Sequence, residues 1–346
     1  MRIKIVVSIV LIVAVLMACI PNSEESLIPT SWPKPVYDFT KNEPSIAKIN
    51  FGRVLFYDPI LSQNNTISCA SCHLQYTAFT HIDHALSHGI NDKIGTRNSP
   101  TLINLAWNKS FMWDGAVNHL DMQALAPIAH PAEMGSSIDA VVTTLQQDIF
   151  YKALCYKAYQ DSTLTGERIL KALSSFELTL ISADAKYDSV MRNQAVFTAQ
   201  EANGYSLFKQ HCASCHTEPL FTNGLFENNG LPEDSILADK GRMRITNDSN
   251  DMHTFKVPTL RNIEYSYPYM HDGRFKKLAD VLTHYTSGIE HYPNLSAPLS
   301  QPIILTSNEK VDIIAFLLTL SDRHFLFNKN YSYIRKDHPS ILQSKD

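Results

Sequence analysis

The sequence predicts an all-α protein whose two domains repeat one unit. Apolar residues recur mostly with helical spacing, and stretches that alternate in the manner of strands are few. The pentapeptide Cys-Ala-Ser-Cys-His occurs twice, at residues 69–73 and 212–216. The chain, 346 residues long, also exceeds what one hydrophobic core usually holds. We therefore expect helical domains at 46–195 and 196–346, after a leader at 1–18 and a proline-containing linker at 19–45.

The leader has the pattern of a bacterial export signal. Arg2 and Lys4 form a basic head, and residues 5–17 form an apolar run that is short for a bilayer span. Ala18 and then Cys19 follow, which resembles the site where bacterial lipoproteins are cleaved and lipidated. An ordinary signal peptide with an incidental cysteine is the alternative. The pattern favours a periplasmic protein that is held on a bacterial membrane by lipid at Cys19.

The charge balance argues against nucleic acid as a partner. The chain carries 30 Lys and Arg residues against 34 Asp and Glu residues, for a formal net charge of −4. Because the basic residues form no cluster, nucleic-acid binding has no electrostatic support, whereas a basic protein partner remains compatible.

The repeated pentapeptide is the attachment signature of c-type haem. Its two thiols add to the haem vinyl groups, and the histidine that follows becomes the proximal iron ligand. A disulfide, a zinc site and a thioredoxin-like redox pair compete with this interpretation, but two copies in an exported chain favour two covalently attached haems. The predicted residues are Cys69, Cys72 and His73 in the first copy and Cys212, Cys215 and His216 in the second.

Predicted helices flank each signature. A Gly-x-x-Leu-Phe element at 52–56 and again at 204–208 resembles the N-terminal helix of a cytochrome c fold. Capping boxes begin at Thr198 and Thr306. Cys155 has no sequence partner and is either a small buried hydrophobe or a reactive thiol. The helices that close the halves have apolar faces formed by Ile169, Leu173, Phe176 and Leu180, and by Val311, Ile314, Leu317 and Leu318.

A second repeat distinguishes the two halves. Pro-Thr-Leu-x-Asn and Met-x-Asp-Gly occur with equal spacing at 100–115 and 258–273, so positions 158 apart should be equivalent. Twelve residues after Gly273 comes Tyr285, and twelve after Gly115 comes Pro127. A tyrosine phenolate can ligate ferric haem and proline cannot. We expect a second haem closed by His216 and Tyr285 and a first haem that is open.

With these motifs, residues 45–322 resemble the bacterial di-haem cytochrome c peroxidases and their relative MauG. Further matching segments are 52–58, 95–100, 111–115, 131–134 and 267–273. The resemblance implies an oxidoreductase that reduces hydrogen peroxide to water at the open N-terminal haem. Its electrons would come from a small cytochrome c or cupredoxin and be relayed through the C-terminal haem.

The resemblance also implies roles for three side chains. Gln123 and Glu133, ten residues apart, match a pair that lines the family's peroxide pocket. Glu133 is the expected acid/base group, because peroxide cleavage needs a proton moved between the two oxygens. Taken alone it would read as a solvated glutamate. Trp113 matches a tryptophan between the haems, although an isolated tryptophan is more often part of a core.

A calcium ion between the domains is a further implication. Its expected ligands are the side chain of Asn98 and the backbone carbonyls of Ser266 and Pro268, which are oxygen donors of the kind calcium prefers. His271, the repeat counterpart of Trp113, resembles a family histidine near the second haem.

Departures from the family pattern leave alternatives open. Ile90 stands where many members place a distal histidine on the first haem, which predicts an enzyme that is already open when oxidised. Tyr285 replaces a methionine of many peroxidases, which moves the chain toward MauG. Other candidate ligands are His81, His84 and His88 for the first haem, and His284 and Met270 for the second.

Two other functions therefore compete with a peroxidase. A MauG-like enzyme would oxidise a protein or organic substrate, and Tyr285 supports it. A non-catalytic electron carrier would require six ligands on both irons.

Overall fold

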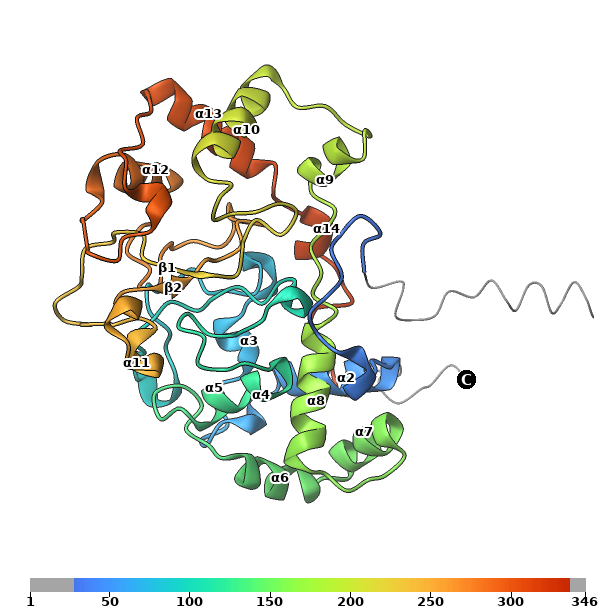
Figure 1. Cartoon of the computed structure of the whole chain (residues 1–346). Coiled ribbons are helices and arrows are strands. Elements are labelled where there is room, and N and C mark those ends of the chain that lie inside the picture. Colours follow the sequence, from blue (N-terminus) through green and yellow to red (C-terminus); the bar gives the residue numbers. More distant parts are fainter. Residues whose placement is uncertain (1–27, 337–346) are drawn as a thin grey trace, which may run out of the picture. The chain divides into compact units, whose positions relative to one another are not determined.

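The computed structural model describes residues 28–336 (Figure 1). The described residues fall into two units that divide after Pro35. The described part of the first unit, 28–35, contains turns and extended chain. The predicted export signal and Cys19 lie outside the described residues. Within 28–336, no helix has the length and apolar character needed to cross a membrane.

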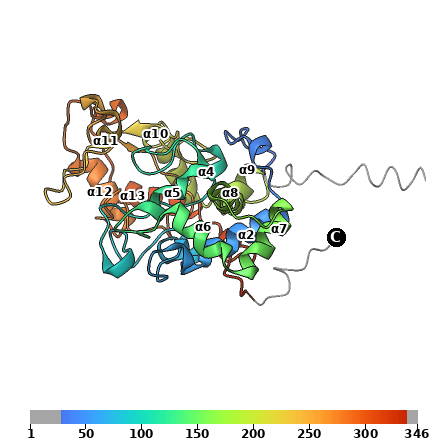
Figure 2. The ribbon, with the colours of Figure 1, turned by 90° about the horizontal axis from the view of Figure 1, so that it is seen from below.

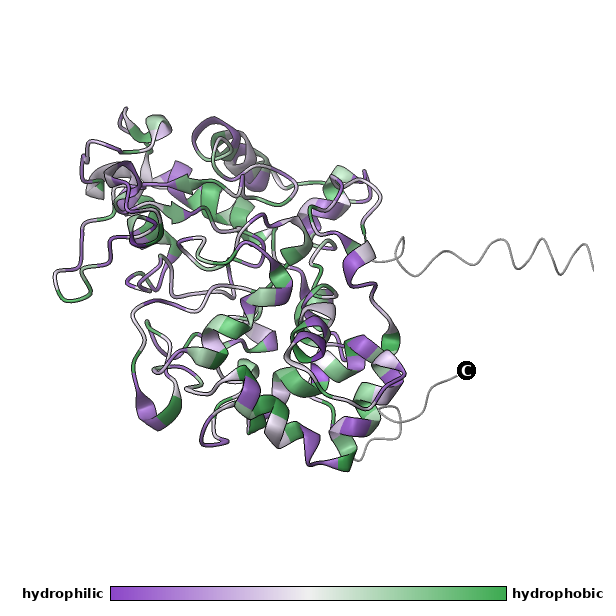
Figure 3. Ribbon diagram, turned by 60° about the horizontal axis from the view of Figure 1, so that its bottom comes forward, coloured by the Kyte–Doolittle hydropathy of each residue, from purple (hydrophilic) through white to green (hydrophobic). Residues whose placement is uncertain are grey.

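The second unit is mainly helical, as predicted, with one two-stranded antiparallel ribbon of β1 (Phe226–Glu227) and β2 (Phe255–Lys256). Amphipathic helices carry both polar and apolar residues along their length (Figure 3). The helices of the first half are α2 (Ile46–Tyr57), α3 (Cys69–Cys72), α4 (Leu120–Gln123), α5 (Leu125–Ala129), α6 (Ile138–Gln146), α7 (Ile149–Tyr159) and α8 (Gly166–Glu177). Those that follow are α9 (Lys186–Met191), α10 (Ala199–His211), α11 (Met243–Thr246), α12 (Leu278–Thr283), α13 (Ser307–Leu318) and α14 (Arg323–Leu326).

Each half is built around one pair of closely packed helices. In the first half α2 packs against α8, and in the second α10 packs against α13 (Figures 1 and 2). A Cβ atom on Gly52 would lie 1.8 Å from the carbonyl oxygen of Ala172, and one on Gly204 would lie 1.9 Å from that of Asp312. The glycine of each Gly-x-x-Leu-Phe element therefore allows the two backbones to touch.

The second sequence repeat also has the same structure twice. Phe111 N–H donates to the carbonyl of Val117 at 2.7 Å, and Tyr269 N–H donates to that of Phe275 at 2.7 Å. In both copies the methionine and the glycine of Met-x-Asp-Gly have positive φ. The predicted internal repeat is thus confirmed, and equivalent positions can be compared between the halves.

Two segments cross the predicted division at residue 195. Tyr187 of α9 packs in the apolar core of the second half, with Phe208 and Phe316. In the opposite direction, the end of the described chain returns to the first half, where Tyr57 Oη donates to the carbonyl of Tyr331 at 2.7 Å. The halves are therefore tied together by exchanged segments, and the domain boundary itself stays a prediction.

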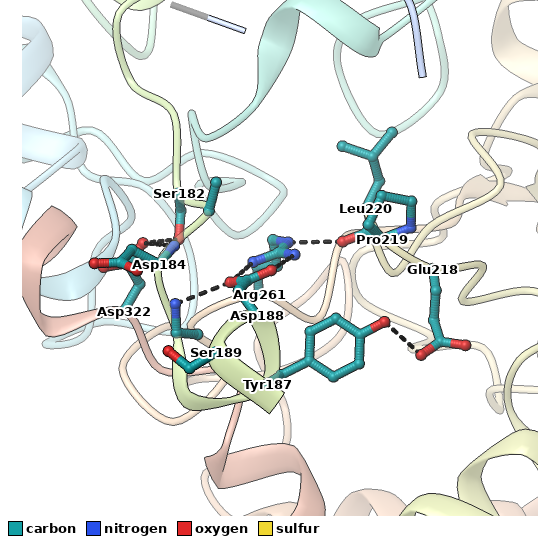
Figure 4. A network of polar contacts seen from close by, with 12 residues as sticks. Ser182, Asp184, Tyr187, Asp188, Ser189, Glu218, Pro219, Leu220, Arg261 and Asp322 are labelled. Atoms are coloured by element: carbon teal, nitrogen blue, oxygen red, sulfur yellow. Dashed lines mark hydrogen bonds and ion pairs between the residues drawn. The ribbon is translucent and has the colours of Figure 1, made fainter. Parts of the chain in front are cut away.

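A buried ion pair anchors α9 to the second half (Figure 4). The side chain of Arg261 is fully buried, and its two terminal nitrogens donate to the carboxylate of Asp188 at 2.9 and 2.7 Å. Its Nε donates to the carbonyl of Pro219 at 2.8 Å. Ile103 occupies the equivalent repeat position in the first half.

Candidate functional site

The first attachment motif forms one helical turn that presents its histidine. α3 spans the two cysteines, and Ser68 and Ser71 close a capping box at its start. The Nδ1 of His73 donates to the carbonyl of Phe79 at 2.8 Å, which leaves Nε2 free to bind a metal. Burial lowers the pKa of His73 to about 4, so the imidazole is neutral at pH 7, the form that ligates iron.

The second attachment motif repeats this arrangement. His216 Nδ1 donates to the carbonyl of Phe221 at 3.1 Å, and burial lowers the pKa of His216. In both halves a backbone carbonyl a few residues after the histidine fixes the ring and its tautomer. A positioned neutral imidazole beside two thiols is the donor set of c-type haem, so both motifs fit this cofactor.

One large, mainly apolar cavity contains the predicted ligands of the second haem. Cys212, Cys215 and His216 line it from one motif, and Tyr285 lines it from the segment after α12. The remaining wall includes Leu278, Val281, Leu282, Leu299, Ile303 and Leu317. Two thiols, an imidazole and a phenol in an apolar cavity fit a c-type haem, which Cys212, Cys215, His216 and Tyr285 would hold.

Tyr285 lies on a π-helical turn, His284–Gly288, that continues α12. Asn229 Nδ2 donates to its hydroxyl oxygen at 3.5 Å. Burial raises the pKa of Tyr285 to about 12, against a lowering by the Asn229 hydrogen bond. The phenol is thus neutral by itself, and coordination to ferric iron would displace its proton.

The alternative ligands of the second haem differ in availability. Nε2 of His284 donates to the carbonyl of Asn229 at 3.1 Å, which uses that nitrogen. Met270 lines the cavity, and its sulfur accepts from Asn229 Nδ2 at 3.5 Å. Sequence reasoning does not identify Asn229, because no local pattern marks an amide that bridges Met270 and Tyr285 from another loop.

The predicted peroxide-pocket residues lie on consecutive short elements of the first half. Gln123 ends α4, Pro127 lies in α5, and the carbonyl of Pro127 accepts from Met134 N–H at 3.2 Å. The Glu133 carbonyl accepts from Ile90 N–H at 2.8 Å, so the loop with Ile90 rests on the Glu133 backbone.

The carboxylate of Glu133 lies near the first attachment site. Burial raises its pKa, and His130, whose Nδ1 is 3.6 Å from Oε1, opposes that shift. Burial first, and then the charge of Glu133, raise the pKa of the Cys72 thiol. The Glu133 side chain is 37% exposed. It can therefore exchange protons both with solvent and with the site.

The histidines of the neighbouring loop form a stack. Ring centroids of His81 and His84 are 5.2 Å apart, and those of His84 and His88 are 4.0 Å apart. The His88 carbonyl accepts from the thiol of Cys72 at 3.5 Å. The stack thus lies beside the first attachment site, and iron ligation by one of its members stays an alternative. Ile90 is buried.

Trp113 is linked to Asn98, one of the predicted calcium ligands. Trp113 belongs to the first half but lines the cavity of the second, and its Nε1 donates to the carbonyl of Asn98 at 2.8 Å. Asn98 N–H donates to the carbonyl of His271 at 2.7 Å. The backbone of Asn98 therefore links Trp113 with His271, which is its counterpart in the second repeat.

Asn98, Ser266 and Pro268, the three predicted calcium ligands, all line the same large cavity. Asn98 Nδ2 donates to the carbonyl of Ala85 at 2.9 Å, so the amide oxygen of Asn98 points away from Ala85. Among residues 28–336 no group of three or more His, Cys, Asp or Glu side chains could hold a metal ion. The predicted calcium ligands, an amide oxygen and two backbone carbonyl oxygens, are not donors of that kind, but they are oxygen atoms of the type that calcium binds.

Comparisons with known proteins agree with these features. The family model described as di-haem cytochrome c peroxidase matches residues 46–196, and that of cytochrome c matches 201–321. Methylamine utilization protein MauG of Methylorubrum extorquens is 34% identical over 283 residues, which cover 79% of this chain and 78% of MauG. Cytochrome c551 peroxidase of Nitrosomonas europaea is 35% identical over 248 residues, 69% of this chain and 72% of the peroxidase. The crystal structure of a MauG-like protein associated with microbial copper homeostasis is similar at a TM-score of 0.78, with 31% identity, and covers 88% of this chain and 97% of that one.

Proposed function

The chain belongs to the family of di-haem cytochrome c peroxidases and MauG, and we propose that it reduces hydrogen peroxide to water at the first of two c-type haems. Family membership makes it an oxidoreductase. Electrons from a small cytochrome c or cupredoxin reach the first haem through the second. The protein works in the periplasm, held to a membrane by lipid at Cys19.

The difference between Tyr285 and Pro127 carries this proposal. Tyr285 shares a cavity with His216, Cys212 and Cys215, which supports a role in holding the second haem: its phenolate would bind the iron together with His216. Pro127, at the equivalent position of the first half, has no donor atom in its side chain. One closed site transfers electrons and one open site accepts peroxide.

The residues around the open site have defined tasks. The haem supplies the redox chemistry when it is bound. Glu133 moves a proton between the peroxide oxygens, and burial, which raises its pKa, makes the carboxyl group hold a proton more readily than an exposed glutamate does. Gln123 orients peroxide by hydrogen bonding. Trp113 provides a π-system between the two sites, which shortens the distance an electron must cross.

Peroxide consumption with a reduced cytochrome c tests the function. We expect two molecules of cytochrome c to be oxidised for each peroxide consumed, because the reduction of peroxide to water takes two electrons. A protein with both haems attached that leaves peroxide and reduced cytochrome c unchanged would contradict the proposal.

A MauG-like oxidase is the second candidate, and Tyr285 in place of methionine favours it. The similarity to MauG at 34% identity supports the same reading. Such an enzyme would direct the oxidising equivalents of peroxide to a protein or organic substrate. Peroxide-dependent oxidation of an added protein, without turnover of reduced cytochrome c, would select this candidate.

We also propose that one calcium ion binds between the halves, with ligands Asn98, Ser266 and Pro268. All three residues line the same cavity, which supports the site. The ion would connect the segment that contains Asn98 with the segment that contains Ser266 and Pro268.

Tyr285→Phe tests the closed site. The ring still fills the cavity, but the phenolate ligand is lost, so we expect the absorption and paramagnetic resonance spectra of the second haem to change and those of the first to stay the same. Tyr292→Phe, in the same half and bonded to Glu290, is the matched control and should leave both haems unchanged. Wild-type spectra in Tyr285→Phe would exclude Tyr285 as a ligand.

A further inference from the structure

The repeat also relates the contacts between the two halves. Asn98 N–H of the first half donates to the carbonyl of His271 in the second half at 2.7 Å. In the opposite direction, Lys256 N–H of the second half donates to the carbonyl of Trp113 in the first half, also at 2.7 Å. Asn98 and Lys256 are equivalent positions of the repeat, and so are Trp113 and His271. The contacts therefore have approximate two-fold symmetry, in which each half holds the other in the same way.

The proposed calcium site has a counterpart under this symmetry. Its ligands are the side chain of Asn98 in the first half and the carbonyls of Ser266 and Pro268 in the second half. The counterpart combines one side chain of the second half with two carbonyls of the first half, at the equivalent positions Lys256, Asn108 and Ser110. The second site thus has a lysine where the first has an asparagine.

An ammonium group occupies the counterpart site. Lys256 Nζ donates at 2.9 Å to the carbonyl of Ser110, which corresponds to the carbonyl of Pro268 in the calcium site. Lys256 and Asn108 line the same cavity as the three proposed calcium ligands. Burial lowers the pKa of Lys256 to about 8, and the charge of Asp114 opposes this shift. Because most of the lysine is still protonated at pH 7, this site contains a positive charge of its own.

The ammonium group and the metal ion have the same task in this arrangement. A carbonyl oxygen is an acceptor for an ammonium N–H and is also a ligand for calcium. Lys256 binds the carbonyls of Ser110 and Trp113, so it holds the segment around Trp113 from the second half without a metal. Asn98 has a neutral side chain, so the segment of Ser266 and Pro268 needs a metal ion for an equivalent attachment.

We propose that the ammonium group of Lys256 is a tethered cation that replaces calcium at the second of two symmetry-related sites between the halves. The inference rests on the proposed calcium site, and it makes Lys256 a positioning residue for Trp113. The protein thus uses one metal ion and one side-chain cation for the same purpose. Removal of calcium then affects the segment that contains Ser266 and Pro268, and leaves the segment around Trp113 in place.

Lys256→Asn tests the proposal, because it gives the second site the amide oxygen of the first. Calcium titration of the haem-loaded, chelator-treated protein, followed by calorimetry, should show one site in the wild type and two in Lys256→Asn. Lys256→Met offers no oxygen ligand, and Lys276→Asn changes an exposed lysine of the same half, so both should keep one site. A Lys256→Asn protein that binds no more calcium than the wild type would overturn the proposal.

The same titration separates this inference from the calcium proposal on which it rests. Asn98→Ala should bind no calcium, and Asn98→Ala combined with Lys256→Asn should bind one ion at the second site. If the wild type binds none and Lys256→Asn binds one, the calcium proposal fails and the role of Lys256 stands. If neither protein binds calcium, both proposals fail.

Amide hydrogen exchange distinguishes positioning by a cation from a general effect on stability. Lys256→Met should speed exchange in residues 108–117 at least about tenfold, the usual worth of a hydrogen bond from a charged group. A calcium chelator should speed exchange in residues 264–273 of the wild type and leave 108–117 unchanged. Added calcium should restore slow exchange in 108–117 of Lys256→Asn, and not of Lys256→Met. Absence of this rescue, or faster exchange of 108–117 in the chelator-treated wild type, would show that Lys256 does not take the place of a metal ion.

Discussion

Replacement of Glu133 by glutamine is expected to slow peroxide turnover roughly a hundredfold or more, the usual worth of a positioned acid/base group. Glutamine preserves the shape of the side chain and can still hydrogen-bond, but it cannot carry a proton between the two oxygens of peroxide. The carboxylate lies near Cys72, and burial raises its pKa, so it is suited to this transfer. Steady-state peroxide consumption with reduced cytochrome c measures the effect.

The spectra and a nearby variant control this experiment. Both haems of Glu133→Gln should keep wild-type spectra, since Glu133 is not an iron ligand in this account. Asp139→Asn, in the exposed first turn of α6, should consume peroxide at the wild-type rate. Undiminished turnover in Glu133→Gln would remove Glu133 from the reaction.

Replacement of Arg261 by methionine is expected to lower the free energy of unfolding by about 3–5 kcal/mol, the cost of breaking a buried ion pair from one side. The substitution leaves the carboxylate of Asp188 buried without its two charged hydrogen bonds, and leaves the Pro219 carbonyl without a donor (Figure 4). Denaturant unfolding of the haem-loaded protein, followed by far-ultraviolet circular dichroism, measures the loss.

Arg192→Met is the matched control for this change. Arg192 pairs with Asp184 at 2.7 Å, but both side chains are well exposed, so the loss should stay below about 1 kcal/mol. The double variant Arg261→Met, Asp188→Leu should recover much of the lost stability, because it removes the unpaired charge as well. Equal losses in Arg261→Met and Arg192→Met would show that burial of the pair has no special role.

Internal repetition made much of the fold predictable from sequence. The capping boxes at Thr198 and Thr306 are local patterns with local causes, and both appear in the structure as expected. The helices expected at the two Gly-x-x-Leu-Phe elements appear as α2 and α10. The exchange of segments was not predictable. Tyr187 and Tyr331 contact partners far away in sequence, and no periodicity encodes which core such a residue joins.

The candidate site, too, could be predicted from the sequence only in part. The attachment motifs and Tyr285 follow from sequence spacing, and the structure places those of the second half around one cavity. Asn229 required the structure, because it reaches Met270 and Tyr285 from a different loop.

The central claim is that the first iron is open and the second is closed by Tyr285. Electron paramagnetic resonance of the fully oxidised, haem-loaded protein tests it most directly. We predict one high-spin ferric signal from a five-coordinate first haem beside one low-spin signal from the second, and in Tyr285→Phe a change in the low-spin signal alone. Two low-spin signals that persist after partial reduction, or one haem per chain, would contradict the account.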